Sequence, residues 1–173
     1  MKLDKLDGGS VYVDTNVLYM YLRSDPNHIP VIKTFLRRVV RGEINAHVGL
    51  LVLDELFYRL LLARVKDSTN RNPIDVLRED LVRIIKEYSG PIEMAIRKLI
   101  FLPHMNISGI ETTDLDRMMN NIKTFSLLPR DALHVATMQR LGLTDVASDD
   151  MDFDRVEWLT RHWIINPPDK RNH

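Results

Sequence analysis

Apolar residues along the chain follow two patterns, namely short continuous runs and longer segments with apolar positions every three or four residues. The short runs predict buried β-strands, and the longer spacing predicts amphipathic α-helices. From the runs we expect strands at 11–13, 44–48, 105–110, 145–147 and 163–165. From the spaced segments we expect helices around 18–22, 30–41, 50–65, 74–88, 92–102, 113–125 and 129–142.

Turn-forming residues predict where these segments end. Asp25-Pro26-Asn27 ends the first helix, and the polar residues 66–73 predict a loop after the long apolar helix. Ser89-Gly90-Pro91 predicts a break between the two helices that follow. Because strands alternate with helices, the pattern as a whole predicts an α/β layer fold with a mostly parallel sheet of four to five strands.

The chain has 173 residues, of which 45% are hydrophobic, and this suits one domain over residues 1–173. We expect its core at about 10–166 and a charged tail at 167–173. It has no cysteine, which excludes disulfides and thiolate metal sites. The first residues carry acids where a signal peptide needs an apolar run, and no apolar stretch reaches membrane-spanning length. We therefore expect a cytoplasmic protein without membrane contact.

The formal net charge is zero, from 24 basic and 24 acidic side chains, whereas nucleic-acid binders are usually basic. Any RNA contact must therefore rely on a local basic patch. Lys33, Arg37 and Arg41 recur at spacings of four, with Arg38 beside them. This stripe is either a solvated helix face or a surface that attracts phosphates. Low net charge also weakens repulsion between copies, which leaves room for a homodimer or a higher oligomer.

Four acidic residues lie at positions that a solvated surface does not explain. Asp14 directly follows the first predicted strand, and Asp150 follows the fourth. Asp131 comes just after Pro129 at the start of a helix, and Glu55 interrupts an otherwise apolar helix. Ligands of open parallel sheets bind beyond the carboxyl ends of strands. We therefore expect the side chains of Asp14 and Asp150 to meet in one pocket.

Each acid also has a structural interpretation. Asp14 could cap the helix that follows it, and Asp131 could interact with the dipole of its own helix. Glu55 could form an ion pair with Arg59 four residues on. The acids within 149–152 could form a solvated turn. The catalytic interpretation depends on the consistent placement of all four at the ends of strands and helices.

Carboxylates held close together repel one another and raise each other's pKa, so a pocket of this kind needs a cation. Mg²⁺ and Mn²⁺ prefer carboxylate oxygens as ligands. A divalent ion lowers the pKa of a water for attack on phosphorus and neutralises charge on the phosphate. The acids therefore predict metal-dependent hydrolysis of a phosphodiester, for which no protein nucleophile is needed.

Four segments resemble the sequence motifs of the PIN-domain nucleases, and the match extends from about residue 10 to residue 166. They are Val-Tyr-Val-Asp14-Thr-Asn16-Val-Leu, Leu-Leu-Val-Leu-Asp-Glu55-Leu, Leu-Pro-Arg-Asp131-Ala-Leu-His134 and Ser148-Asp149-Asp150-Met-Asp152-Phe153. The resemblance implies a three-layer α/β/α fold with strand order 3-2-1-4-5. It also implies cleavage of RNA with Mg²⁺ or Mn²⁺. Many small members of the family are dimeric VapC-like toxins, each silenced by a partner antitoxin.

The resemblance implies that Asp14, Glu55, Asp131 and Asp150 hold the metal and are the catalytic residues. Further polar residues of the motifs could support them by hydrogen bonding to carboxylates or to a metal-bound water. These are Asn16 and Ser148, with Asp149 and Asp152 as alternates to Asp150. The motif register favours Asp150 over Asp149.

Two features depart from the family pattern. Gly49 occupies a position at which the family often has Ser or Thr, just before the helix that carries Glu55. The region between 66 and 105 is longer than in minimal toxins. These departures leave the acids in place but weaken the assignment as a toxin.

Two other functions compete with the ribonuclease. The first is a catalytically inactive PIN-like module that binds RNA or protein, and the presence of all four acids argues against it. The second is a phosphatase with Asp14 as its covalent nucleophile. The usual second acid of such an enzyme would lie two residues on, where this chain has Asn16.

Overall fold

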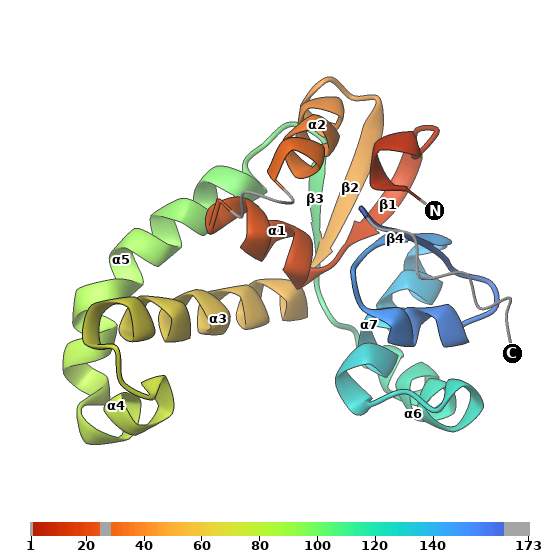
Figure 1. The fold of residues 1–173 in the computed structure, drawn as a ribbon. Coiled ribbons are helices and arrows are strands. Elements are labelled where there is room, and N and C mark those ends of the chain that lie inside the picture. Colours follow the sequence, from red (N-terminus) through yellow and green to blue (C-terminus); the bar gives the residue numbers. More distant parts are fainter. Residues whose placement is uncertain (1, 25–28, 165–173) are drawn as a thin grey trace, which may run out of the picture.

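In the computed structural model, which describes residues 2–24 and 29–164, the strands form one parallel sheet in the order β3-β2-β1-β4-β5 (Figure 1). The strands are β1 Gly9–Val13, β2 Ile44–Gly49, β3 Met105–Ser108, β4 Asp145–Ala147 and β5 Thr160–His162. This topology confirms the predicted α/β fold and its strand order.

Helices flank the sheet on both sides (Figure 1), and the buried apolar side chains of the strands and helices form one core cluster. The helices are α1 Thr15–Leu22, α2 Ile29–Val40, α3 Leu50–Thr69, α4 Pro73–Glu79, α5 Leu81–Ile100, α6 Asp114–Phe125 and α7 Pro129–Leu141. Two short 3-10 helices, η1 Leu3–Lys5 and η2 Met151–Arg155, complete the described elements. No helix in the described ranges has both the length and the apolar character needed to cross a bilayer.

The helical region between β2 and β3 differs from the sequence prediction. The loop expected at 66–73 is only partly correct, because α3 continues to Thr69 and ends where Asn70 adopts a left-handed conformation. The break expected at Ser89-Gly90-Pro91 is wrong, because α5 runs through these residues. The helices separate instead at Asp80, whose side chain accepts a hydrogen bond from the Arg83 N–H at 3.1 Å.

Tertiary packing explains why Pro91 does not end α5. The buried face of the helix lies on both sides of the proline and packs against the rest of the core. This burial outweighs the single backbone hydrogen bond that a proline removes. Helices α3 and α5 lie side by side, with α4 at their far end (Figure 1).

The last strand is also displaced from its predicted position. It covers 160–162 rather than 163–165, and Trp163 instead forms an isolated bridge with Lys2. Sequence pattern missed this strand because two of its residues are buried polar ones that find partners. Arg161 pairs with Asp154 at 2.7 Å, and His162 bonds the Asp145 carboxylate at 2.6 Å. Ile165, the predicted break at 25–27 and the tail 167–173 lie outside the described residues.

The strand order creates a switch point between β1 and β4. The chain crosses from β1 to β2 in one direction along the sheet and later enters β4 on the opposite side of β1. Val13 is paired with Ala147, and the Asp14 N–H donates to the Ala147 carbonyl at 3.1 Å. The residues that follow β1 and β4 therefore leave the sheet next to each other, which places the candidate site.

Candidate active site

Asp14 lies at the carboxyl end of β1 and caps α1, with only 7% of its surface exposed. Its carboxylate accepts hydrogen bonds from the Thr15 N–H at 2.7 Å and from the Ser148 hydroxyl at 2.5 Å. Burial raises the pKa of Asp14 to about 6 even though both hydrogen bonds lower it, and the charges of Glu55 and Asp149 raise it further. The predicted capping role and the predicted site role therefore fall on the same side chain.

Asp131 lies in the first turn of α7, half-buried. Among the described residues its carboxylate has neither a hydrogen bond nor an ion pair. Burial raises its pKa to about 6, and the charges of Asp150, Asp152 and Glu55 add to this, while Arg130 opposes it. A bound cation would relieve the repulsion between Asp131 and these three acids.

Glu55 connects these two acids, because its charge raises the pKa of Asp14 and that of Asp131. It extends from α3 between two arginines. The Glu55 carboxylate lies 3.8 Å from Arg59 of the same helix and 3.8 Å from Arg130 of α7. The pair with Arg59 is the one that helical spacing predicts, and the pair with Arg130 was not predicted.

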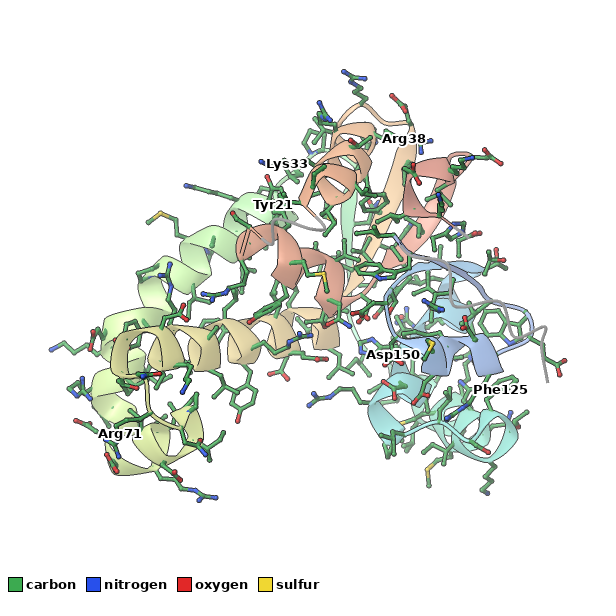
Figure 2. All side chains as sticks on the ribbon, in the orientation of Figure 1. Tyr21, Lys33, Arg38, Arg71, Phe125 and Asp150 are labelled. Carbon is green, nitrogen blue, oxygen red and sulfur yellow. The ribbon has the colours of Figure 1, made fainter. Side chains whose placement is uncertain are left out.

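The loop after β4 brings the acids of the fourth motif to the same edge of the sheet. The buried Ser148 hydroxyl accepts from the Asp150 N–H at 3.0 Å, and the Asp150 carboxylate accepts from the Asp152 N–H at 2.8 Å. Asp150 thus caps η2, while its charge acts on Asp131 of α7. Figure 2 shows Asp150 on this loop, on the side of the sheet where α1 and α3 begin.

Asn16 lies within a chain of polar contacts at this edge. Its amide donates to the Asp149 carboxylate, and it accepts from the Arg59 guanidinium, which is stacked 4.4 Å from the centre of the Tyr19 ring. The same amide lies 3.5 Å from the Asp14 carboxylate. The structure therefore places Asn16 and Ser148 beside the acids that they were predicted to support, and it places Asp149 against Asn16.

Sequence reasoning missed Arg130 and the second contact of Arg59. Arg130 precedes Asp131 directly, and nothing in its spacing indicates that it reaches a glutamate on another helix. The contact between Arg59 and Asn16 joins α3 to α1, so it depends on how these helices pack. Only the helical spacing of Glu55 and Arg59 carried a signal in the sequence.

The donor set fits a hard divalent cation in its chemistry, because it consists of carboxylate oxygens, and the Asp131 carboxylate has no partner among the described residues. Within residues 2–24 and 29–164, no three acidic or histidine side chains are grouped closely enough to hold one ion as they stand. Glu55 is held by two arginines and Asp149 by Asn16. Metal binding therefore requires rotation of some of these side chains.

A parallel sheet in the order 3-2-1-4-5, with acids collected where its strand order reverses, is the architecture of small α/β nuclease domains. The chain matches the family model of the PIN domain over residues 11–159 and belongs to this family. It is 24% identical over 159 residues to Ribonuclease VapC2 of Methanocaldococcus jannaschii, across 92% of this chain and 97% of that protein.

Two solved structures show the same fold. The Sarcin-Ricin loop cleaving toxin VapC20 of Mycobacterium tuberculosis matches with a TM-score of 0.55 and 12% identity, over 91% of this chain and 99% of that one. A toxin–antitoxin complex from Klebsiella pneumoniae matches with a TM-score of 0.52 and 16% identity, over 87% and 95%. The fold predicted from sequence is therefore confirmed.

Proposed function

We propose that the chain is an endoribonuclease that hydrolyses RNA phosphodiester bonds with Mg²⁺ or Mn²⁺. Asp14, Glu55, Asp131 and Asp150 would hold the ion. When bound, the ion supplies a water of lowered pKa and neutralises charge on the phosphate. Membership of the PIN family and similarity to a protein named as a ribonuclease support the activity.

The residues of the chain have distinct tasks in this proposal. Asp14 is the fixed anchor, because Ser148 and the Thr15 backbone hold its carboxylate in one orientation. Asp131 is free to turn, since nothing among the described residues bonds it. Glu55 would exchange Arg59 and Arg130 for the ion, which leaves both guanidinium groups available to an RNA phosphate.

One observation supports this proposal above the others. Carboxylates from the end of β1, from α3 and from α7 share one electrostatic environment, in which Glu55 raises the pKa of both Asp14 and Asp131. Capping alone does not require these acids to lie near one another, and their mutual repulsion costs stability.

The test is cleavage of an end-labelled RNA panel with Mg²⁺, with Mn²⁺ and with EDTA. Asp131→Asn keeps the shape of the side chain and removes its charge, and we expect a loss of at least about a hundred-fold in kcat, as for removal of a group that stabilises charge in the transition state. Asp116→Asn is the matched control, because Asp116 is an exposed acid in the first turn of α6. RNA binding without cleavage, unchanged in Asp131→Asn, would instead establish a binding module.

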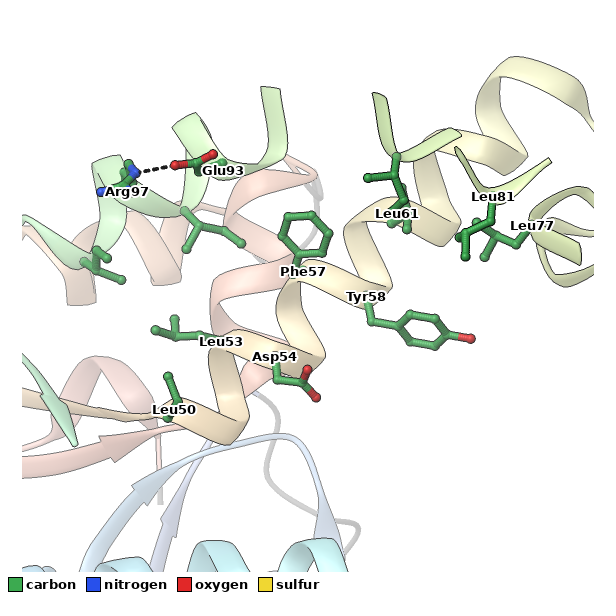
Figure 3. Close-up of a pocket in the computed structure, with 13 residues that line it drawn as sticks. Leu50, Leu53, Asp54, Phe57, Tyr58, Leu61, Leu77, Leu81, Glu93 and Arg97 are labelled. Carbon is green, nitrogen blue, oxygen red and sulfur yellow. Dashed lines mark hydrogen bonds and ion pairs between the residues drawn. The ribbon is translucent and has the colours of Figure 1, made fainter. Parts of the chain in front are cut away.

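We further propose an antitoxin protein as a partner. An open groove of about 830 Å³ lies between α3, α4 and α5 and is lined mainly by apolar side chains, among them Leu53, Phe57 and Leu61 (Figure 3). Apolar surface of this kind is typical of protein-binding sites. The solved toxin–antitoxin complex with the same fold supports this class of partner. The test of the antitoxin is co-purification of the product of an adjacent gene, which we expect to be lost in Phe57→Ser. We also propose a homodimer, which light scattering of the chain alone tests.

A further inference from the structure

A buried tyrosine and a buried histidine are joined beneath the candidate site. Tyr12 is 1% exposed and His134 is 3% exposed. The Tyr12 hydroxyl lies 2.8 Å from His134 Nδ1, and the two rings meet edge to face with centroids 5.7 Å apart. The two residues are 122 positions apart in the sequence, so the bond ties β1 to α7.

Gly49 completes this contact. Its backbone N–H donates to the Tyr12 hydroxyl, and a Cβ added to Gly49 would lie 2.1 Å from that oxygen. The φ of Gly49 is −72°, which any residue adopts, so the requirement for glycine here is one of space. Gly49 therefore departs from the family pattern because the Tyr12 hydroxyl occupies the space that a side chain at this position would need.

The protons of this contact can be assigned. The Tyr12 oxygen accepts from Gly49, and burial raises the pKa of the phenol, so the hydroxyl keeps its proton and donates it to His134 Nδ1. Burial lowers the pKa of His134 to about 4, so the imidazole is neutral and carries its proton on Nε2. The three groups form a neutral hydrogen-bonded unit.

Each member of this unit lies close in the chain to one of the site acids or to the helix that carries it. Tyr12 precedes Asp14 by two residues, so both side chains lie on the same face of the chain. His134 follows Asp131 by three residues on one face of α7. Gly49 ends β2 and is the N-cap of α3, the helix of Glu55.

We propose that Tyr12, Gly49 and His134 are positioning residues that set the spacing of Asp14, Glu55 and Asp131. This inference rests on the proposed function of the acids as a metal site. The unit acts through its hydrogen bonds, which connect β1, the junction of β2 with α3, and α7 at one buried point. Groups of this kind tune a metal site by orienting its ligands.

The test compares two tyrosine-to-phenylalanine variants. Tyr12→Phe removes the central hydroxyl, and Tyr88→Phe removes a hydroxyl that bonds Ser68 at 2.9 Å on the exposed side of α3 and α5. Both are measured for Mn²⁺ affinity by calorimetry and for kcat and KM on RNA. For Tyr12→Phe we expect about a ten-fold weaker Mn²⁺ affinity and about a ten-fold lower kcat, with KM within about two-fold. Tyr88→Phe should behave as wild type.

A second pair of variants separates positioning from core stability. His134→Asn keeps a carbonyl oxygen that can accept from Tyr12, whereas His134→Leu removes the acceptor and leaves the hydroxyl buried without a partner. We expect His134→Asn to retain most of the Mn²⁺ affinity and His134→Leu to lose it. Equal Mn²⁺ affinity and kcat in wild type, folded Tyr12→Phe and folded His134→Leu would overturn the proposal.

Failure of the proposed function has a different signature. A wild-type chain that neither binds Mn²⁺ nor cleaves RNA would refute the metal site itself. The positioning role is then decided by crystal structures of the wild type and Tyr12→Phe. A Cγ–Cγ separation between Asp14 and Asp131 that is the same in both structures would overturn it, and a changed separation would support it.

Discussion

The acidic site should reduce the stability of the fold, and Asp131→Asn measures by how much. The pKa of Asp131 is raised from 3.8 to about 6. At about 1.4 kcal/mol per pH unit, the charged Asp131 side chain lowers the free energy of unfolding by at most about 3 kcal/mol. Burial is the main cause of this shift and repulsion the second, and because Asp131 is only half-buried, solvent reduces both. Its position in the first turn of α7 also favours a carboxylate. We expect the variant to be more stable by about 1 kcal/mol at pH 8.

The sign of the pH dependence follows from the direction of the shift. The folded state holds the Asp131 proton more tightly than the unfolded state, so it binds more protons between about pH 4 and pH 6. The stability of the wild type relative to Asp131→Asn therefore falls as pH rises through this window. The advantage of the variant should be complete at pH 8 and absent at pH 4.

Urea unfolding at both pH values provides the assay, with a melting point about 2–4 °C higher for Asp131→Asn at pH 8 as an independent check. Asp116→Asn is the control, since Asp116 occupies the first turn of α6 and is exposed. The control should be neutral or slightly destabilised. The reasoning fails if Asp131→Asn is as unstable as this control at pH 8.

Three further predictions concern other parts of the molecule. Ser148→Ala removes the hydroxyl that holds Asp14, and we expect it to lower the free energy of unfolding in urea by about 1–3 kcal/mol. It should also lower kcat with a smaller change in KM, and a kcat equal to that of the wild type would count against the anchoring role. Pro91→Ala restores a backbone donor inside α5, so it should raise the free energy of unfolding by about 1–3 kcal/mol. RNA cleavage should stay unchanged, and a loss of stability would contradict the prediction. The double variant Lys33→Gln with Arg37→Gln should lower the slope of log affinity for RNA against log salt by about 1 to 2 if α2 binds phosphates, and an unchanged slope would show a solvated face.

Most of the helices and strands were readable from the sequence because they depend on local periodicity. The strand order was predicted only through the resemblance to the PIN family. The strand at 160–162 was not readable. Its buried Arg161 is tolerated only because Asp154, seven residues away, pairs with it. Local pattern contains no information about such a partner.

The continuity of α5 through Pro91 is a similar case. The local signal of Ser-Gly-Pro is a break, and only the apolar face buried against the core overrides it. At the site, the acids were proposed from their places at the ends of strands and helices and from the resemblance to the PIN family, and helical spacing predicted the pair of Glu55 with Arg59. The contacts that join distant elements, such as Arg130 with Glu55 and Tyr12 with His134, depend on tertiary packing and could not be predicted.

The central claim is that Asp14, Glu55, Asp131 and Asp150 together hold a divalent ion. Anomalous diffraction from crystals soaked in Mn²⁺ tests it most directly. The account predicts one peak, or two close together, within bonding distance of carboxylate oxygens from both Asp14 and Asp131, with Glu55 turned away from Arg59 and Arg130. A well-ordered crystal with no peak at this edge of the sheet, or with Mn²⁺ only at other surface acids, would contradict it.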